Sequence, residues 1–312
     1  MEVQLKQTLY ISAGGFGWLY YGHMYESYIF SGHESFPCKT LWLTKGYDFV
    51  NGKGNFNAPD AVMALGVGKN MVSSIRYWLK AFGLCEQDGP TDNARYLFDE
   101  SNGADRYIES LGTLWLLHYL LVSGKEATLY NITFVLFQRE RKTFEREQLV
   151  SFVGRIMAED GKGKAFNANT VKKDVSVLLQ NYTQPYRAKS SEDYSTLLID
   201  LDLLRVEDGG KSYAFNIEGK RKVPMEIFLY AVLNEKAKLK DKSVPYDTLQ
   251  EIGLMFCMTD AEVIDMAQAI GEKYPEHVQY SDNAGIRQLL FREGSSLERA
   301  DVLDKYYKNA TV

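Results

Sequence analysis

Residues 61–79 read Ala-Val-Met-Ala-Leu-Gly-Val-Gly-Lys-Asn-Met-Val-Ser-Ser-Ile-Arg-Tyr-Trp-Leu, and this stretch is the strongest indication of the fold. It predicts a short helix over residues 61–65, with Asp60 as its N-cap, and then a glycine turn. A second helix is predicted from about Lys69 to Phe82, because apolar residues recur there at helical spacing. Such a helix pair with polar groups outward is typical of a DNA-binding helix-turn-helix. We expect five outward residues of the second helix to contact DNA: Lys69, Asn70, Ser73, Arg76 and Tyr77.

Two other interpretations of this stretch stand beside DNA binding. Many helical pairs have the same pattern without touching nucleic acid. The Gly-Val-Gly-Lys sequence also resembles a phosphate-binding loop, but a P-loop requires Ser or Thr after the lysine, and Asn70 follows Lys69. The sequence thus excludes a P-loop and leaves open the choice between a DNA-binding and a structural helix pair.

The flanking residues complete a predicted winged-helix module. Residues 30–50 read Phe-Ser-Gly-His-Glu-Ser-Phe-Pro-Cys-Lys-Thr-Leu-Trp-Leu-Thr-Lys-Gly-Tyr-Asp-Phe-Val. Pro37 in the expected first turn predicts a helix from Phe36 to Val50. Residues 84–99 have turn chemistry between short apolar runs, which predicts a β-hairpin after the helix-turn-helix.

A second module of the same kind is predicted from about residue 130. Residues 130–137 are apolar enough for a buried helix or a buried strand, and the sequence does not separate the two. One helix is expected to start near Thr143, and another is capped by Asn167 or Asn169. A hairpin at residues 203–217, with Asp-Gly-Gly at its tip, completes the module.

This second module is basic, although the chain as a whole is acidic. Residues 139–189 hold eleven Lys and Arg against six Asp and Glu, whereas the formal net charge of the chain is −5. A nucleic-acid surface must therefore be a local patch. Four lysines cluster around the second helix of this module, and we expect them to bind DNA phosphates: Lys162, Lys164, Lys172 and Lys173.

The remaining sequence predicts helices without a motif. An apolar helix is expected from Asp105 to Val122, with His118 in the core or at an interface. Residues 224–312 are predicted to be helical, with Asp260 opening one helix and short extended pieces at residues 278–280 and 286–291 that could pair. The predicted fold is mainly α with small β-hairpin wings, in four parts: an N-terminal aromatic and glycine-rich extension (1–29), winged-helix module 1 (30–125), basic winged-helix module 2 (126–222) and a helical C-terminal region (223–312).

Composition is that of an ordinary globular protein. The chain has 312 residues, of which 45% are hydrophobic and 25% charged. Its three cysteines match no zinc-binding pattern and suggest a reducing compartment. The N-terminus lacks a signal sequence, and the longest apolar run, from Leu111 to Val122, is too short to span a bilayer. These features predict a cytoplasmic protein.

Residues 30–78 also carry a resemblance to a known bacterial family. Three phrases carry it: Phe30-x-Gly-His-Glu-x-Phe36, Trp42-Leu-x-Lys-Gly46 and Leu65-Gly-Val-Gly-Lys-Asn-Met-Val-x-Ser-Ile-Arg-Tyr-Trp78. Together they resemble a family long catalogued as a domain of unknown function. Its members are similar to SspB, the DNA-nicking component of single-strand DNA phosphorothioation systems.

The resemblance implies a DNA-nicking endonuclease that uses Mg²⁺ and acts on double-stranded DNA in phosphorothioate modification and phage defence. It implies three partners, a cysteine desulfurase, an ATPase and an ATP-pyrophosphatase-like protein, and no membrane; a homodimer is left open. Two alternatives are a non-enzymatic DNA-binding adaptor that recruits the modification enzymes and a winged-helix transcriptional regulator.

Nicking needs carboxylates to hold a cation and a base to activate water. His33 and Glu34 lie in the first phrase, before a predicted helix whose free N–H groups favour phosphate. We therefore favour His33, Glu34 and Asp48 as catalytic residues, with Glu34 as a metal ligand and Lys45 on DNA. In the alternative interpretation, His33 and Glu34 only cap the helix and fix the entry loop.

Two further acidic patterns are weaker candidates. Asp208 with Glu218-Gly-Lys220 mimics the Asp…Glu-x-Lys arrangement of restriction-type nucleases, and Asp200 with Asp202 places two carboxylates on one face of a possible strand. Short patterns of this kind arise often by chance in a chain with 41 Asp and Glu. Both patterns therefore rank below the first candidate.

Overall fold

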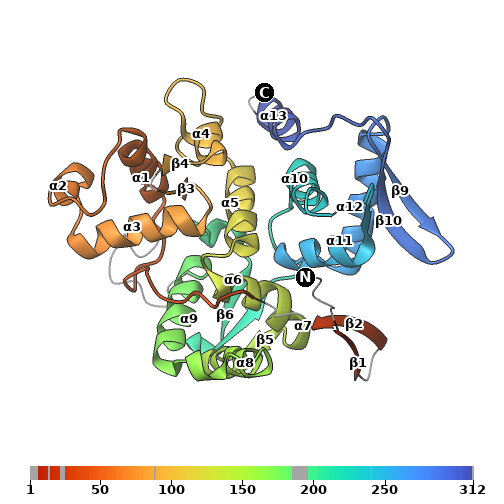
Figure 1. The fold of residues 1–312 in the computed structure, drawn as a ribbon, viewed down its shortest axis with the longest axis horizontal. Coiled ribbons are helices and arrows are strands. Elements are labelled where there is room, and N and C mark those ends of the chain that lie inside the picture. Colours follow the sequence, from red (N-terminus) through yellow and green to blue (C-terminus); the bar gives the residue numbers. More distant parts are fainter. Residues whose placement is uncertain are drawn as a thin grey trace.

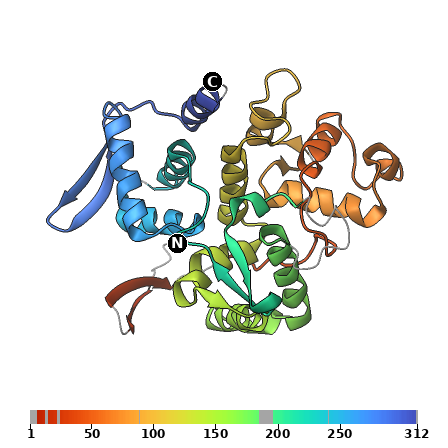
Figure 2. The ribbon, with the colours of Figure 1, turned by 180° about the vertical axis from the view of Figure 1, so that it is seen from behind.

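Helix α5 (Leu111–Ser123) lies at the centre of the molecule, and three lobes pack around it (Figure 1). The computed structural model describes residues 6–12, 15–21, 25–87, 89–184, 196–239 and 241–310. The helices and strands of the first lobe lie within residues 42–98, those of the second within residues 128–215 and those of the third within residues 225–291. Figures 1 and 2 both place the first and third lobes on opposite sides of α5 and the second lobe beyond the C-terminal end of this helix. Ten of the thirteen α5 residues are buried, as expected for a helix that is apolar all round.

Helix α5 starts later than the sequence predicted. The prediction placed its first residue near Asp105, but the helix begins at Leu111 because Ser110 is the N-cap and its Oγ accepts the N–H of Gly112. Asp105 instead accepts the N–H groups of Glu109 and Ser110 in the preceding turn. None of the described helices combines the length and the apolar character needed to cross a bilayer.

The first lobe contains the predicted helix pair. Its elements are α1 (Trp42–Asn51), α2 (Ala61–Leu65), α3 (Lys69–Ala81), β3 (Cys85–Glu86), β4 (Gly89–Pro90) and α4 (Asp92–Phe98). Gly66, with φ of 61°, ends α2 in the left-handed conformation that the glycine turn predicted.

Three predictions for the first lobe were wrong in detail. Helix α1 begins at Trp42 rather than Phe36, because the backbone of Cys38 and Lys39 bonds to the second lobe, through Asn181 and a bridge to Thr196, instead of forming helical hydrogen bonds. Asp60 occupies the predicted N-cap position of α2, but its side chain makes no capping hydrogen bond. The predicted hairpin has only two residues in each strand, because Thr91 accepts the N–H of Ala94 and starts α4 where the second strand was expected.

The second lobe has the predicted order of helices followed by a hairpin. Its elements are α6 (Thr128–Asn131), the π-helix η1 (Ile132–Phe137), α7 (Gln138–Glu140), β5 (Thr143–Phe144), α8 (Arg146–Glu159), η2 (Gly163–Ala165), α9 (Ala168–Tyr182), η4 (Ile199–Leu201), β6 (Leu204–Glu207), η5 (Asp208–Gly210) and β7 (Ser212–Phe215). The predicted hairpin is confirmed as β6 and β7, and β5 pairs with the other edge of β7.

In the second lobe, neighbouring residues determine most of the helix boundaries. Residues 130–137 are helical, which answers the question that the apolar pattern left open. Asn167 is the N-cap of α9, and its Oδ1 accepts the N–H groups of Asn169 and Thr170 at 3.0 and 3.1 Å. Thr143, the predicted helix start, lies in β5, because the capping box of α8 is built two residues later, on Glu145.

The third lobe repeats the topology of the second. Its elements are α10 (Met225–Lys236), β8 (Ser243–Pro245), α11 (Tyr246–Met255), α12 (Asp260–Lys273), β9 (Val278–Asn283) and β10 (Ile286–Phe291). Both lobes run helix, strand, helix, helix, strand, strand, and the sheet orders β5-β7-β6 and β8-β10-β9 correspond. The helices and the β9–β10 pairing were predicted, whereas strand β8 was not.

The two ends of the chain add one hairpin and one helix. Strands β1 (Lys6–Ser12) and β2 (Gly15–Tyr21) pair antiparallel, where the sequence predicted only an extension. Helix α13 (Arg299–Ala310) packs along α10 and returns to α5, where the hydroxyl of Tyr306 accepts the N–H of Gly112 at 2.9 Å. The C-terminal helix thus ties the third lobe to the centre of the molecule.

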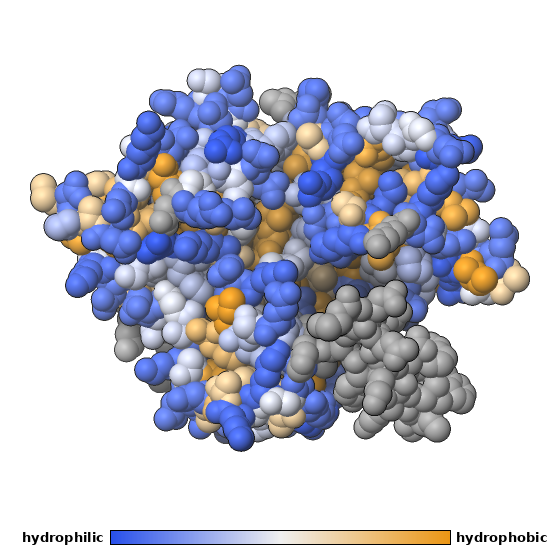
Figure 3. Space-filling view, in the orientation of Figure 1, coloured by the Kyte–Doolittle hydropathy of each residue, from blue (hydrophilic) through white to orange (hydrophobic). Residues whose placement is uncertain are grey.

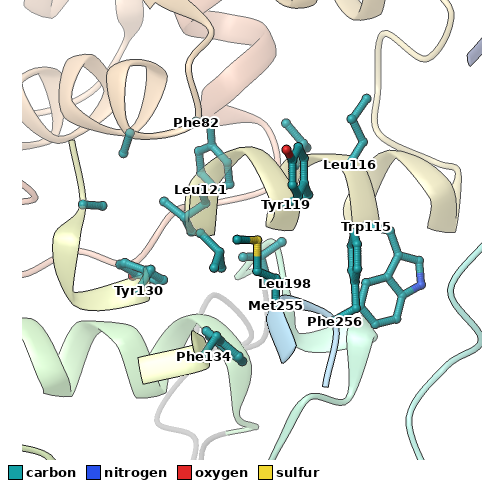
Figure 4. Close-up of a cluster of buried hydrophobic side chains, with 14 of the residues drawn as sticks. Phe82, Trp115, Leu116, Tyr119, Leu121, Tyr130, Phe134, Leu198, Met255 and Phe256 are labelled. Atoms are coloured by element: carbon teal, nitrogen blue, oxygen red, sulfur yellow. The ribbon is translucent and has the colours of Figure 1, made fainter. Parts of the chain in front are cut away.

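The core is continuous through all three lobes. Figure 4 shows Trp115 and Tyr119 of α5 beside Met255 of α11 and Phe256, with Phe134 of η1 on the other side of the cluster. The fully buried His118 lies in this core, as predicted: its Nε2–H donates to the carbonyl of Met255 at 2.6 Å, and its Nδ1 accepts the hydroxyl of Tyr182 at 2.7 Å. Burial lowers the pKa of His118 to about 4.

Candidate nucleic-acid interface

Residues 25–38 pass between α3 of the first lobe and α9 of the second (Figure 1). Side chains of the second lobe bind the backbone of this segment. Thr128 Oγ1 accepts the N–H of Ile29 at 2.9 Å, and Asn181 Oδ1 accepts the N–H of Cys38 at 2.9 Å. The segment that carries the first family phrase is therefore a seam between two lobes.

His33 is the most buried polar residue of this seam, with 4% of its surface exposed. Its Nδ1 accepts the N–H of Ser35 at 3.1 Å, so the ring proton lies on Nε2, which donates to Asp174 Oδ1 at 3.0 Å. The ring also lies edge-on to Tyr77, with 5.6 Å between ring centroids, and stacks on Trp78 at 6.3 Å. His33 thus contacts both α3 and α9.

The backbone around His33 is held in an unusual conformation. Ser31, Gly32, Glu34 and Ser35 all have positive φ, at 70°, 97°, 48° and 64°. A side chain at Gly32 would place its Cβ 2.7 Å from Tyr77 Cδ2, so only glycine fits against α3. Non-glycine residues in the left-handed region persist where surrounding contacts hold them, and such sites are often functional.

Glu34 and Asp48 have different environments. Glu34 is exposed, and it does not cap α1, which begins eight residues later. Asp48, on α1, accepts two hydrogen bonds from the guanidinium of Arg106, at 2.8 and 2.9 Å. The Asp48 carboxylate is therefore already neutralised by a partner from the first lobe.

Asp48 and Lys45 line a surface pocket of about 470 Å³ with an apolar rim. Leu41 and Tyr107, which also line it, are each 60% exposed. Figure 3 shows further apolar colour at the left edge of the view, where Figure 1 places α2. Met63 of this helix is exposed. This side of the first lobe is more apolar than a phosphate-binding surface is expected to be.

The predicted contact face of α3 is narrower than the sequence indicated. Lys69, Asn70 and Ser73 are exposed near the N-terminus of the helix. Arg76 is half-buried and donates from Nη1 to Asn57 Oδ1 at 3.1 Å. Tyr77 packs on the loop at Gly32, and burial raises the pKa of its hydroxyl.

The second lobe presents three of its four predicted lysines. Lys164, Lys172 and Lys173 are exposed, and within the described residues they and Lys69 form no ion pair. Lys162 is different: its ammonium donates to the carbonyls of Tyr25 and Glu26 and lies 3.3 Å from Asp160 Oδ2. Lys162 therefore fixes the seam segment.

The two weaker acidic patterns have partners as well. Lys220 binds Glu262 of α12 at 3.0 Å, whereas Asp208 accepts the hydroxyl of Ser212 at 2.9 Å within the β6–β7 hairpin. Asp202 pairs with Arg205 at 2.8 Å. Asp200 is exposed and lines a separate pocket of about 490 Å³.

Helix α12 occupies in the third lobe the place that α9 has in the second, but its charge is opposite. Its exposed residues include Asp260, Asp265 and Glu272. A negative helix face repels DNA phosphates. The exposed cations that distinguish the candidate interface therefore belong to α3 and to α9 with its lead-in.

The family model described as "Protein of unknown function (DUF4007)" matches residues 30–307. The chain belongs to this family. Two solved structures are similar: a magnesium ion-bound SspB crystal structure, with a TM-score of 0.81, 29% identity and coverage of 91% of this chain and 89% of that chain, and a second SspB crystal structure, with a TM-score of 0.80, 28% identity and the same coverage. A comparison with curated proteins finds no match. The predicted resemblance to SspB is thereby confirmed.

One of the SspB structures holds a magnesium ion. In the described part of this DUF4007 chain, no group of three or more His, Cys, Asp or Glu side chains could hold a metal. His33 is engaged by Asp174 and Ser35, and Asp48 is engaged by Arg106, which leaves Glu34 as an exposed carboxylate. These three residues do not form a ready-made magnesium site.

Asp174 is the residue of this DUF4007 site that sequence reasoning missed. It is an acid in a basic segment, and it lies three residues after the buried Val171 and four before the buried Leu178. That spacing places Asp174 on the inward side of α9. A carboxylate on the buried side of a helix requires a hydrogen-bond or ionic partner, and this requirement is the signal in the sequence that could have identified Asp174.

Proposed function

We propose that this DUF4007 protein binds duplex DNA through α3 and α9. The observation that carries the proposal is that α3 and α9 are each the second of a helix pair, and that one loop contacts both. Helix α3 presents the exposed Lys69 and helix α9 the exposed Lys172 and Lys173, and within the described residues none of the three forms an ion pair. In this proposal the first two lobes act as winged-helix modules, with β6 and β7 as the wing of the second and β3 and β4 as a short wing of the first. The third lobe shares the topology but has an acidic second helix, so we assign it no DNA contact.

We further propose that the protein acts in phosphorothioate modification of DNA, as a nicking component. The similarity to SspB over most of both chains supports this role. Replacing a non-bridging phosphate oxygen by sulfur requires an accessible backbone, which a nick on one strand would provide. The sulfur would come from partners of the proposed classes: a cysteine desulfurase, an ATPase and an ATP-pyrophosphatase-like protein.

The proposed chemistry centres on the exposed loop rather than on a preformed cage. Mg²⁺ commonly binds proteins through one or two carboxylates together with substrate phosphates. Of the three predicted catalytic residues, Glu34 is the one that would remain available to such an ion beside DNA, because it is exposed. His33 and Asp48, by contrast, already have structural partners.

A DNA-binding adaptor is the second candidate function, and one observation favours it. Two of the three predicted catalytic side chains are occupied by hydrogen bonds within the protein. An adaptor would need the lysines of α3 and α9 but no reactive carboxylate. It would hold DNA for the modification enzymes without cutting it.

Supercoiled plasmid separates these functions. The full chain would be incubated with plasmid in Mg²⁺ and in chelator, with binding followed by gel shift. Conversion to open circles in Mg²⁺ alone supports nicking, whereas shifted but intact plasmid supports the adaptor. Absence of any shift at low salt, where phosphate contacts are strongest, would contradict DNA binding itself.

A further inference from the structure

Asp174 is a buried carboxylate whose two oxygens bind the same loop. It is 6% exposed, and it lies in α9 directly after Lys173. Its Oδ2 accepts the N–H of Ser31 at 2.7 Å, and its Oδ1 accepts Nε2–H of His33 at 3.0 Å. Asp174 thus fixes both the backbone and the imidazole of the loop to α9.

The same loop is fixed to α3 on its other side. Gly32 lies directly against the ring of Tyr77, which is four residues after the exposed Ser73. The indole N–H of Trp78 donates to the carbonyl of Phe36 at 3.1 Å. Residues 31–36 therefore connect the two helices that carry the proposed DNA contacts.

We propose that residues 31–36 form a rigid joint that makes α3 and α9 one binding site for a single continuous duplex, with Asp174 as the positioning residue. This inference rests on the proposed DNA binding and adds its substrate class: a duplex long enough to reach both helices. When two contact surfaces are fixed at the right separation, the second contact forms at a high effective concentration. Two surfaces on a loose connection lose most of that gain.

The backbone of the loop supports a joint rather than a passive linker. Four of the five residues from Ser31 to Ser35 have positive φ. Such a backbone persists only where contacts hold it, and the two hydrogen bonds to Asp174 are contacts of that kind. Loss of Asp174 is therefore expected to release the loop and with it the fixed arrangement of α3 and α9.

The test compares the affinity of the full chain for a short and a long duplex of mixed sequence by fluorescence anisotropy. The two duplexes span about one and about three helical turns, with roughly 10 base pairs in a turn. After correction for the larger number of binding positions, the wild type is expected to bind the long duplex at least about 10-fold more tightly. Asp174→Asn should lose most of this preference, because its amide N–H group would face one of the two donors of the loop, the Ser31 N–H or His33 Nε2–H. The variant should keep the wild-type affinity for the short duplex.

The matched control is Asp200→Asn, which makes the same change in charge on an exposed carboxylate of the same lobe. It should keep the wild-type preference. His33→Gln retains a donor toward Asp174 and should also keep it, whereas His33→Leu should lose it. If Asp174→Asn does not fold, the comparison of His33→Gln with His33→Leu tests the joint instead.

Two results would overturn the joint while leaving DNA binding intact. One is a wild type that binds both duplexes equally after correction. The other is a folded Asp174→Asn variant with the full length preference. A wild type that binds neither duplex would instead contradict the proposed function, so the two failures are distinguishable.

Discussion

At the scale of single residues, the structure separates side chains that adjoin one another in the sequence. His33 is buried and bound to Asp174, whereas the next residue, Glu34, is exposed with φ of 48°. The alternative in which Glu34 caps a helix is wrong, because α1 begins at Trp42 with no side-chain cap. Its local backbone therefore leaves Glu34 free for a role outside the fold.

Glu34→Gln tests that role. If Glu34 takes part in the proposed nicking, its loss should lower the nicking rate by roughly 100-fold or more, as when a group acting on the reaction is removed. The free energy of unfolding should change by less than about 0.5 kcal/mol, as for other surface substitutions. The measurements are plasmid relaxation and urea denaturation. Glu100→Gln, which changes an exposed glutamate of the first lobe, is the control. A Glu34→Gln variant that still nicks at the control's rate would contradict the assignment.

At the scale of elements, sequence patterns predicted caps and turns, which depend on neighbouring residues, and missed contacts between residues far apart in the chain. Asn167 as the cap of α9 and the Asp-Gly-Gly tip of the β6–β7 hairpin follow from neighbouring residues, and both are confirmed. Strand β8 has three residues, too few for a hydrophobic pattern to be recognised. The His33–Asp174 bond joins residues 141 apart, and no local pattern indicates such a contact. The repeat of the second lobe's topology in the third was hidden for the same reason.

The lysines of α9 give a prediction at this scale. Lys172→Gln with Lys173→Gln should weaken binding to all DNA sequences about equally and lower the salt slope by about 2, because each phosphate contact contributes roughly 0.9. The measurement is anisotropy over a range of salt concentrations. Lys305→Gln with Lys308→Gln on α13 makes the same change in charge and should leave the slope unchanged. Equal slopes for the two double variants would remove α9 from the interface.

At the scale of the whole molecule, the three lobes share one core around α5. His118 joins α5 to α9 and α11, and a neutral ring with its proton on Nε2 satisfies both of its hydrogen bonds. The proposed DNA contacts are confined to two of the three lobes. The third lobe and α13 complete the core, and the second helix of the third lobe, α12, is acidic.

Burial of His118 predicts a specific pH dependence of stability. The folded state keeps His118 neutral down to about pH 4. The unfolded chain, in contrast, binds a proton below about pH 6.5. The contribution of His118 is therefore complete above about pH 6.5 and is lost as the pH falls toward 4, by roughly 3 kcal/mol in total. The difference in unfolding free energy between wild type and His118→Gln, measured in urea, should shrink between pH 7 and pH 4.5; a constant difference would contradict the assignment.

Hydrogen exchange of the full chain, with and without a duplex of about three helical turns, shows directly whether α3 and α9 meet DNA. Such a duplex offers one groove face in each turn of roughly 10 base pairs. DNA should slow amide exchange in the loop of residues 31–36 and in the N-terminal turns of α3 and α9. It should leave amide exchange in α12 unchanged. Protection confined to the third lobe, or no protection at a DNA concentration that shifts the protein in a gel, would contradict the assignment of α3 and α9 as the DNA-binding helices.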